Sequence, residues 1–411
     1  MVKVRVAPVF ATLLAAALAV GQYQPVQAGS AESGGYKVLK PIESGDLTLF
    51  PVVRVNGRTP PPDQFLTLDE GLKSGEVEVT EAGRVRGLVR SRSGATPAYR
   101  GDQVNTLVLV NNSKRPLLLL AGEIVTGGKQ DRVIAKDRIV PAGGDPIDLS
   151  VFCIEHGRWT ESSEKFGATA KTSTGSFMVQ PTVRQQAMVA KDQQQVWNSV
   201  NGAISTMAMA ATPATGGPVA RGSASSTVDV QSDPVAVHGS LMAPGLSAGS
   251  ALATTSYAKA MQTQAVSAKV DEAAAGLMQS REQALATLRQ EHALGVVVAL
   301  HGEVIWADIF SGTELLTRYW MKLVRSYAAE GLTAGQEHKI ATIADAQQFL
   351  DKVPHGRETS EGEVGVYRYR EVKSDGTDSF ALESLLPDTG YDVHMSKLKL
   401  KEHGLVRTGS Y

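Results

Sequence analysis

A succession of short apolar runs between residues 36 and 159 constrains the fold of this chain more than any other feature of its sequence. The runs 47–53, 106–110 and 147–155 are rich in branched apolar residues, and turn-forming residues separate them from their neighbours. Short connections join antiparallel strands, because a parallel pair needs a crossover of a dozen residues or more. The pattern therefore predicts an α+β protein whose N-terminal half is an antiparallel β-sandwich or barrel.

The later part of the chain changes to helical periodicity and then returns to strands. Apolar residues at helical spacing predict one helix in 183–209 and a second in 257–292. Ser311 and Glu314 have the spacing of a capping box, so we expect another helix to begin there. Residues 210–256 are rich in Ala, Ser, Thr and Gly, a composition that buries too little apolar surface to fold, so we expect a disordered insertion. The expected parts are a signal peptide (1–28), a flexible N-terminus (29–36), a β-rich region (37–180), a helical region with the insertion (181–294), and a hairpin, helices and C-terminal strands (295–411).

The N-terminus has the three parts of a secretory signal peptide. Lys3 and Arg5 precede the apolar stretch 7–20, and small residues occupy the cleavage positions in 26–28. We expect cleavage after Ala28 and a mature protein that is periplasmic or secreted. A membrane anchor retained in this segment is the alternative. The sequence has no second apolar segment long enough to span a membrane, so we expect no transmembrane segment after cleavage.

Composition argues against several classes of site. The chain has 41 Lys and Arg against 42 Asp and Glu, so no basic excess is present for a nucleic-acid partner. Cys153 is the single cysteine, so an intramolecular disulfide is excluded and a core must stabilise the fold. The histidines include no H-x-x-x-H pair, and Cys153 and His156 would point to opposite faces of a strand. We therefore expect no metal site and no cofactor.

Charged residues concentrate in 118–159, at the ends of the apolar runs. Alternate residues of a β-strand share a face, so 117–123 and 147–155 each present an apolar face that ends in a glutamate, Glu123 or Glu155. A carboxyl group at the rim of a core either has a raised pKa or lies against a cation. The basic residues near these two glutamates in the sequence are therefore candidate partners for them.

We hypothesise that Glu123, Glu155, Arg132 and Arg158 converge on one pocket. The glutamates would do acid–base work, and the arginines would hold an anionic or polyhydroxylated ligand. The full candidate set is Glu123 and Glu155 as catalytic acids, with Lys129, Gln130, Asp131, Arg132, Arg158 and Trp159 as ligand-binding residues. The alternative is an internal network of ion pairs without a ligand, since structural ion pairs also bring charged groups together.

Asp308 is a further candidate from its position alone. It lies at the end of an expected strand, just before the expected helix. Functional acids are often found at such positions, but the helix dipole also stabilises an acid there, so both interpretations stay open.

Two motifs in the central part of the chain are specific. They are RPLLLLAGEIVTGGKQDRVIAKDRIVPAG at 115–143 and VFCIEHGRW at 151–159. With later pieces at 196–197 and 295–310, they resemble the domain named for its association with ADP-ribosylglycohydrolases and rhodanese-phosphatases, over most of residues 40–330. Because that name records association with enzymes of NAD and ADP-ribose metabolism, the resemblance implies an ADP-ribose-like ligand.

The sequence leaves two classes of function open, and with them the question of whether the protein is an enzyme. In the first, an exported protein binds or processes an anionic, sugar-containing small molecule at the candidate residues. In the second, the protein is a non-enzymatic structural or protein-interaction module of the cell envelope, and its polar residues only hold the fold.

Overall fold

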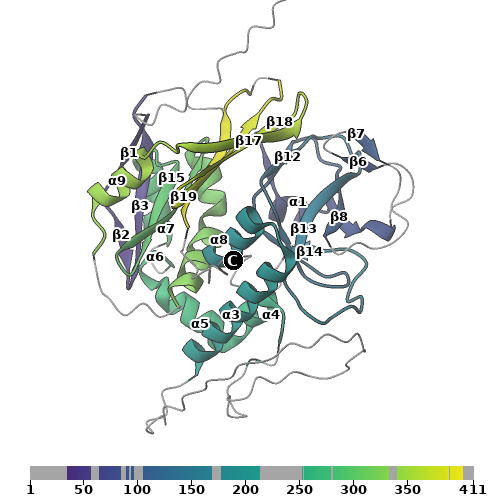
Figure 1. The fold of residues 1–411 in the computed structure, drawn as a ribbon, viewed down its shortest axis with the longest axis horizontal. Helices are drawn as coiled ribbons and strands as arrows, with labels where there is room; N and C mark the ends of the chain where they lie inside the picture. The colour runs from purple at the N-terminus through teal and green to yellow at the C-terminus, as the bar shows by residue number, and fades with distance from the viewer. Residues whose placement is uncertain are drawn as a thin grey trace, which may run out of the picture. The chain divides into compact units, whose positions relative to one another are not determined.

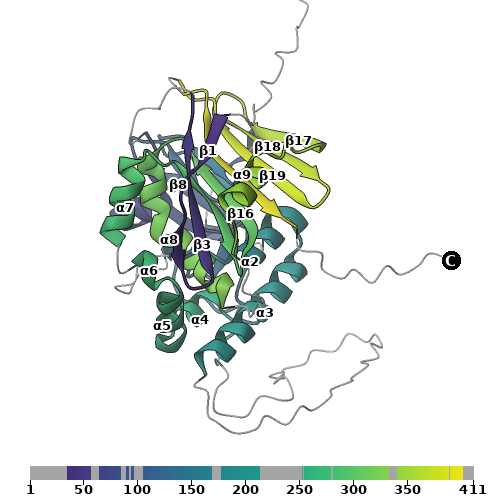
Figure 2. The same ribbon diagram turned by 90° about the vertical axis from the view of Figure 1, so that its left-hand side faces the viewer.

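A nine-stranded antiparallel sheet brings the beginning and the end of the described chain together. The computed structural model describes residues 35–56, 64–84, 89–91, 94–96, 105–168, 177–212, 252, 254–278, 281–332, 340–387 and 389–400, all within the unit Ser33–Tyr411. In these residues the strand order is β1 (Tyr36–Val38), β3 (Leu47–Arg54), β15 (Gly295–Leu300), β16 (Glu303–Phe310), β20 (Asp392–Lys399), β19 (Thr377–Ser384), β18 (Tyr367–Ser374) and β17 (Gly356–Glu363), with β2 (Ile42–Ser44) paired to β3. Figure 2 follows this sheet from β3 through β16 to β17.

The central motif region forms two smaller sheets. Within the described residues the larger one contains β14 (Gly167–Ala168), β10 (Ile124–Thr126), β11 (Arg132–Ile134), β13 (Ile147–Cys153), β6 (Val89–Ser91), β7 (Gly94–Thr96), β8 (Thr106–Asn111) and β5 (Val77–Glu81). The other contains β12 (Arg138–Val140), β9 (Leu117–Leu119) and β4 (Leu66–Thr67). Most of these pairs are antiparallel, whereas β6–β13 and β4–β9 are parallel. The expected α+β fold with an antiparallel N-terminal half is confirmed.

Helices cover both faces of the nine-stranded sheet. The helices of the described residues are α1 (Leu68–Ser74), which packs on the two smaller sheets, α2 (Pro181–Gln185), a π turn (Gln186–Ala190), α3 (Gln193–Ala211), α4 (Tyr257–Gln262), α5 (Gln264–Ala273), α6 (Ala275–Met278), α7 (Arg281–Gln290), α8 (Thr313–Gly331) and α9 (Ile343–Asp351). Val298 and Trp306 belong to the buried cluster that includes the apolar side of α8, while Val297 and Ala307 pack with α9. The two helices accordingly lie on opposite sides of the sheet (Figure 1).

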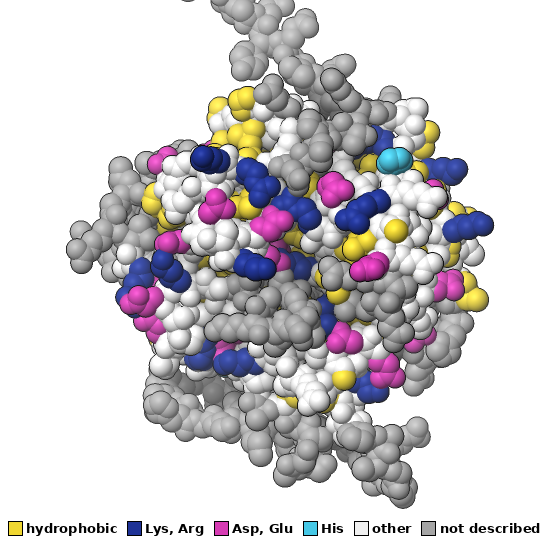
Figure 3. All heavy atoms as spheres, turned by 180° about the vertical axis from the view of Figure 1, so that it is seen from behind, with side chains coloured by type: hydrophobic (Ala, Val, Ile, Leu, Met, Phe, Trp, Pro, Cys, Tyr) yellow, Lys and Arg dark blue, Asp and Glu magenta, His cyan; other side chains and the backbone are white. Residues whose placement is uncertain are grey.

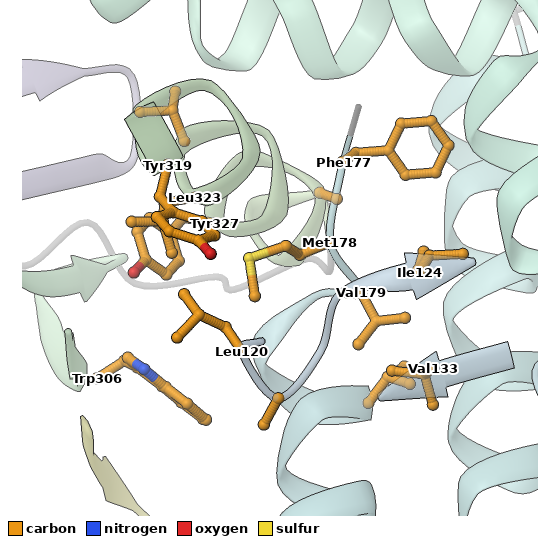
Figure 4. Close-up of a cluster of buried hydrophobic side chains, with 14 of the residues drawn as sticks. Leu120, Ile124, Val133, Phe177, Met178, Val179, Trp306, Tyr319, Leu323 and Tyr327 are labelled. Carbon is orange, nitrogen blue, oxygen red and sulfur yellow. The ribbon is translucent and has the colours of Figure 1, made fainter. Parts of the chain in front are cut away.

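Helix α8 packs against the core along one face, because its apolar residues recur at helical spacing. Tyr319 and Leu323 of α8 face Trp306 of β16 and Leu120 of the loop before β10 (Figure 4). All four side chains are buried. No helix in the described part of the chain is long and apolar enough to cross a membrane.

Two local expectations about helices are wrong. Ser311 does not cap α8, which begins at Thr313 after Gly312 without a side-chain cap. The backbone N–H of Ser311 donates instead to the carbonyl of Val393, so pairing with β20 extends past the end of β16. The helix expected in 257–292 is divided into α4, α5, α6 and α7.

The break between α5 and α6 coincides with contact to the sheet. The N–H of Gly276 in α6 donates to the Ser44 hydroxyl of β2 at 3.0 Å. A Cβ on Gly276 would come within 2.9 Å of the Glu43 carbonyl oxygen, so the helical segment and the strand are in direct backbone contact. Contact with the sheet therefore overrides local helix propensity. The expected signal peptide, and 213–251 of the expected insertion, lie outside the described residues.

Candidate functional site

Glu123 is fully buried and lies against helix α8. One carboxylate oxygen accepts a hydrogen bond from the ammonium of Lys322, and the other accepts from the N–H of Leu120 at 2.8 Å. Lys322 also forms an ion pair with Asp69 of α1 at 2.8 Å. Burial raises the pKa of Glu123, although Lys322 opposes the rise. The acid has no exposed atom, and it ties the motif region to α8.

Glu155 is also buried but stays ionised. One oxygen forms an ion pair with the Arg158 guanidinium at 2.5 Å, and the other accepts from the ammonium of Lys259 at 2.8 Å. The N–H of Asp131 donates to the same carboxylate at 3.2 Å. Burial opposes ionisation, but the hydrogen bonds from Arg158 and Lys259 hold the pKa of Glu155 below its usual range. A carboxylate held in this way is a poor proton donor.

Arg158 holds the glycine turn of the motif in place. Its guanidinium donates to the carbonyl of Gly128 at 2.9 Å and to that of Thr160 at 2.9 Å. It also lies 3.5 Å from the Asp131 carboxylate. Gly128 adopts a φ of 50°, in the left-handed region that favours glycine. The turn is therefore a built part of the network and not an open phosphate loop.

Asp131 closes the other side of the same turn. Its carboxylate accepts from the N–H of Gly127 at 3.1 Å and from the hydroxyl of Ser256 at 2.7 Å. Burial raises the pKa of Asp131, and the nearby charge of Glu155 adds to the rise, while the bond from Ser256 opposes it. Both oxygens thus have partners within the protein.

Arg132 and Gln130 lie inside the fold. The Arg132 guanidinium donates to the Gln130 carbonyl at 2.6 Å and lies 3.8 Å from the Glu81 carboxylate. Glu81 in turn accepts from the N–H of Lys129 at 2.8 Å. Arg132 pairs with Cys153 across β11 and β13, and burial raises the pKa of the Cys153 thiol to about 11. The thiol is therefore protonated at neutral pH.

The predicted site residues do not all share one set of contacts. Glu155, Arg158 and Asp131 form one network, and Arg132 and Lys129 are joined through Glu81. Glu123 is paired instead with Lys322 of α8 and with the N–H of Leu120. The expected convergence of all four residues thus does not hold for Glu123.

A small part of the predicted set reaches the surface. The ring of Trp159 is 46 % exposed, and the ammonium of Lys129 lies 5.1 Å from its centroid. The side chain of Arg158 is 19 % exposed, and that of Lys259 is 55 % exposed. We call Lys129, Arg158, Trp159 and Lys259 the Trp159 surface. On the face shown in Figure 3, basic and acidic side chains are interspersed, as the balanced composition of the chain leads one to expect.

A buried charged network that the sequence did not predict joins three parts of the fold. His394 of β20 lies between two carboxylates, with Nδ1 2.6 Å from Asp137 and Nε2 3.2 Å from Asp308. Arg184 of α2 pairs with Asp308 at 2.8 Å, and the hydroxyl of Tyr327 in α8 donates to the same acid. Asp308, singled out by its place at a strand end, is thus part of an internal network and does not act at the helix N-terminus.

The neighbouring charged groups keep His394 protonated and Asp308 ionised at neutral pH. Burial lowers the pKa of His394, but Asp137 and Asp308 raise it more strongly, to about 9. Burial opposes the ionisation of Asp308, yet Arg184 and His394 hold its pKa well below the usual range. The sequence signal for this network was Asp308, a charged residue among the apolar residues of β16. No set of three His, Cys, Asp or Glu side chains suited to a metal ion occurs among the described residues.

Comparison with known proteins gives one match. Neither a curated protein nor a solved structure matches this chain. The ARG and Rhodanese-Phosphatase-superfamily-associated Protein domain matches residues 35–398, which include both the motif network and the strand that carries His394. The chain therefore belongs to the family of ARG and Rhodanese-Phosphatase-superfamily-associated Protein domains.

Proposed function

We propose that this protein is an exported binding module for an anionic, sugar-containing ligand of the ADP-ribose type, and that the Trp159 surface is its site. The observation that carries the proposal is the ammonium of Lys129, 5.1 Å from the half-exposed ring of Trp159. An aromatic face offers a stacking surface for a base or a sugar, and adjacent cations attract phosphate groups. The name of the family supports this class of ligand by association.

The buried residues support the surface without taking part in chemistry. Glu155 holds Arg158 and Lys259 at 2.5 and 2.8 Å, so the two cations are already oriented before a ligand arrives. Glu123 is buried behind Lys322 and has no access to this surface ligand. We therefore propose binding without acid–base catalysis by either glutamate. Export follows from the proposed signal peptide, with cleavage after Ala28 and a periplasmic or secreted mature protein.

One observation favours the second candidate, a non-enzymatic structural or interaction module of the envelope. Both oxygens of Glu155, and those of Asp131, have partners within the protein. A network satisfied in this way stabilises the fold whether or not a ligand binds. If this candidate is correct, substitutions in the Trp159 surface do not change how the protein responds to any small molecule.

A thermal-shift screen separates the two candidates. The purified protein is tested with ADP-ribose, nucleoside diphosphates, sugar phosphates, neutral sugars and divalent metals. A ligand at about a hundred times its dissociation constant adds about 2.7 kcal/mol of stability, which is readily detected. We expect a shift with ADP-ribose-like ligands that is lost in Trp159→Ala and reduced in Lys129→Met.

The matched control is Lys269→Met, which removes the same charge from an exposed side chain of α5 that pairs with Glu272. It is expected to respond to ligand as the unaltered protein does. A screen in which no anionic ligand shifts the protein would contradict the binding proposal and favour the structural module. Equal shifts in the Trp159→Ala and unaltered proteins would place the site elsewhere.

A further inference from the structure

A hollow lies at the far end of the nine-stranded sheet, and its lining includes no residue of the Trp159 surface. Its volume is about 190 Å³. The residues that line it come from β17, β18 and the turn that follows the π turn: Thr359, Ser360, Glu361, Tyr369, Glu371 and Lys191. Every lining side chain carries a polar group, which suits a ligand that forms several hydrogen bonds.

Strand register brings the lining acids together. Thr359 pairs with Glu371, and Glu361 pairs with Tyr369, across the antiparallel strands β17 and β18. Directly opposed residues of an antiparallel pair, and residues two apart on a strand, project from the same face. All four side chains therefore belong to one face of the sheet, where they meet Lys191.

One polar group of this cavity is buried without a hydrogen-bond partner among the described residues. It is the hydroxyl of Tyr369, a residue that is only 2 % exposed. Glu371 is buried beside it and forms ion pairs with Lys191 at 2.5 Å and with Lys373 at 3.4 Å. A buried polar atom without a partner is costly, and such atoms mark places where a further molecule completes the hydrogen bonding.

The backbone beneath the cavity is strained. Lys191 has a φ of 54°, which is uncommon for a residue with a long side chain. It directly follows the π turn Gln186–Ala190, and π turns are frequent at functional sites. The ammonium of Lys191 lies 2.5 Å from the carboxylate of Glu371. Strain of this kind persists where the surrounding structure holds it, and it is concentrated at ligand sites.

We propose that this cavity binds one small, neutral, polyhydroxylated molecule the size of a single sugar ring. The volume of about 190 Å³ corresponds to roughly six water molecules at about 30 Å³ each, well below that of a drug-sized pocket. The hydroxyl groups of such a ligand both donate and accept, which matches carboxylates beside an ammonium and a phenol. Lys191 and Lys373 are paired with Glu371, and Lys136 is paired with Glu361. Because these charges are balanced, neither an anion nor a cation gains a large net attraction, which favours a neutral ligand.

The test uses the full chain carrying Trp159→Ala, so that ligands of the Trp159 surface do not contribute. Binding of glucose, galactose, mannose and glucose 6-phosphate is followed by saturation-transfer NMR and by thermal shift. Tyr369→Phe removes a single hydroxyl and is expected to weaken the binding of the neutral sugar roughly fivefold. Lys191→Met is expected to weaken it further.

Tyr367→Phe is the matched control, because Tyr367 is buried on the same face of β18 two residues away and does not line the cavity. It is expected to bind as the parent does. The proposal is overturned if no neutral sugar binds saturably, if Tyr369→Phe and Tyr367→Phe behave alike, or if glucose 6-phosphate binds more tightly than glucose. None of these outcomes affects the Trp159 surface, so the two proposals fail independently.

Discussion

His394 is expected to make the stability of this protein fall at alkaline pH. Its ring lies between Asp137 and Asp308, at 2.6 and 3.2 Å, and all three side chains are buried. The two carboxylates raise the pKa of His394 to about 9, against burial, whereas an unfolded chain has the ordinary value of about 6.5. Folding therefore favours the protonated ring.

The sign and size of the effect follow from this difference. A group whose pKa is raised in the folded state adds stability that is complete below its unfolded pKa and is lost as the pH rises through its folded pKa. The interval from 6.5 to about 9 corresponds to roughly 3 kcal/mol, at about 1.4 kcal/mol per pH unit. Most of the contribution of His394 to the free energy of unfolding is thus expected to disappear by about pH 10.

Urea unfolding of the unaltered protein and of His394→Gln, at about pH 6 and about pH 10, measures this contribution. Burial lowers the pKa of Lys397 to about 8, which stabilises the fold as the pH rises, but this effect is common to both proteins and cancels in their difference. The exposed His355→Gln serves as a control for the substitution itself. The reasoning is refuted if the stability difference between the unaltered protein and His394→Gln is as large at the higher pH as at the lower.

Three further changes test the networks around the motif and the core. Gly128→Ala is expected to cost roughly 1–3 kcal/mol in urea unfolding, because a Cβ there would lie 2.2 Å from the Phe166 ring at a φ of 50°; an unchanged midpoint would contradict this. Cys153 is expected to react with iodoacetamide only as fast as the protein unfolds, because it is buried and its pKa is raised to about 11; rapid labelling of the folded protein would argue against it. Arg184→Met removes one of the two cations beside Asp308 and breaks a buried ion pair, so it is expected to cost roughly 3–5 kcal/mol by the same urea measurement, whereas a loss below about 1 kcal/mol would show that the pair is not essential.

Local alternation was enough to predict the interior face of the motif region. The residues at odd positions from Ile147 to Glu155 are all buried, as a period of two requires for a strand against a core. The sequence also predicts the hairpin of β15 and β16, because its turn and its flanking apolar runs are adjacent in sequence. These features depend on neighbours within a few residues.

The partners of the charged side chains depend on the complete fold. Glu123 pairs with Lys322, which lies 199 positions away, and His394 meets Asp137 across 257 positions. Spacing along a strand gives the face on which an acid lies, but it does not give the helix that covers that face. The sequence therefore predicts two glutamates at the rim of a core and groups them in one pocket, whereas packing against α8 assigns them to separate networks.

Calorimetric titration of ADP-ribose into the unaltered protein and into Trp159→Ala tests the central proposal most directly. We predict saturable heat for the unaltered protein and an affinity about tenfold lower for Trp159→Ala, since stacking of a base on an aromatic ring contributes about 1–3 kcal/mol. The same affinity in both proteins, or no saturable heat in the unaltered protein, would contradict the assignment of the Trp159 surface as a ligand site.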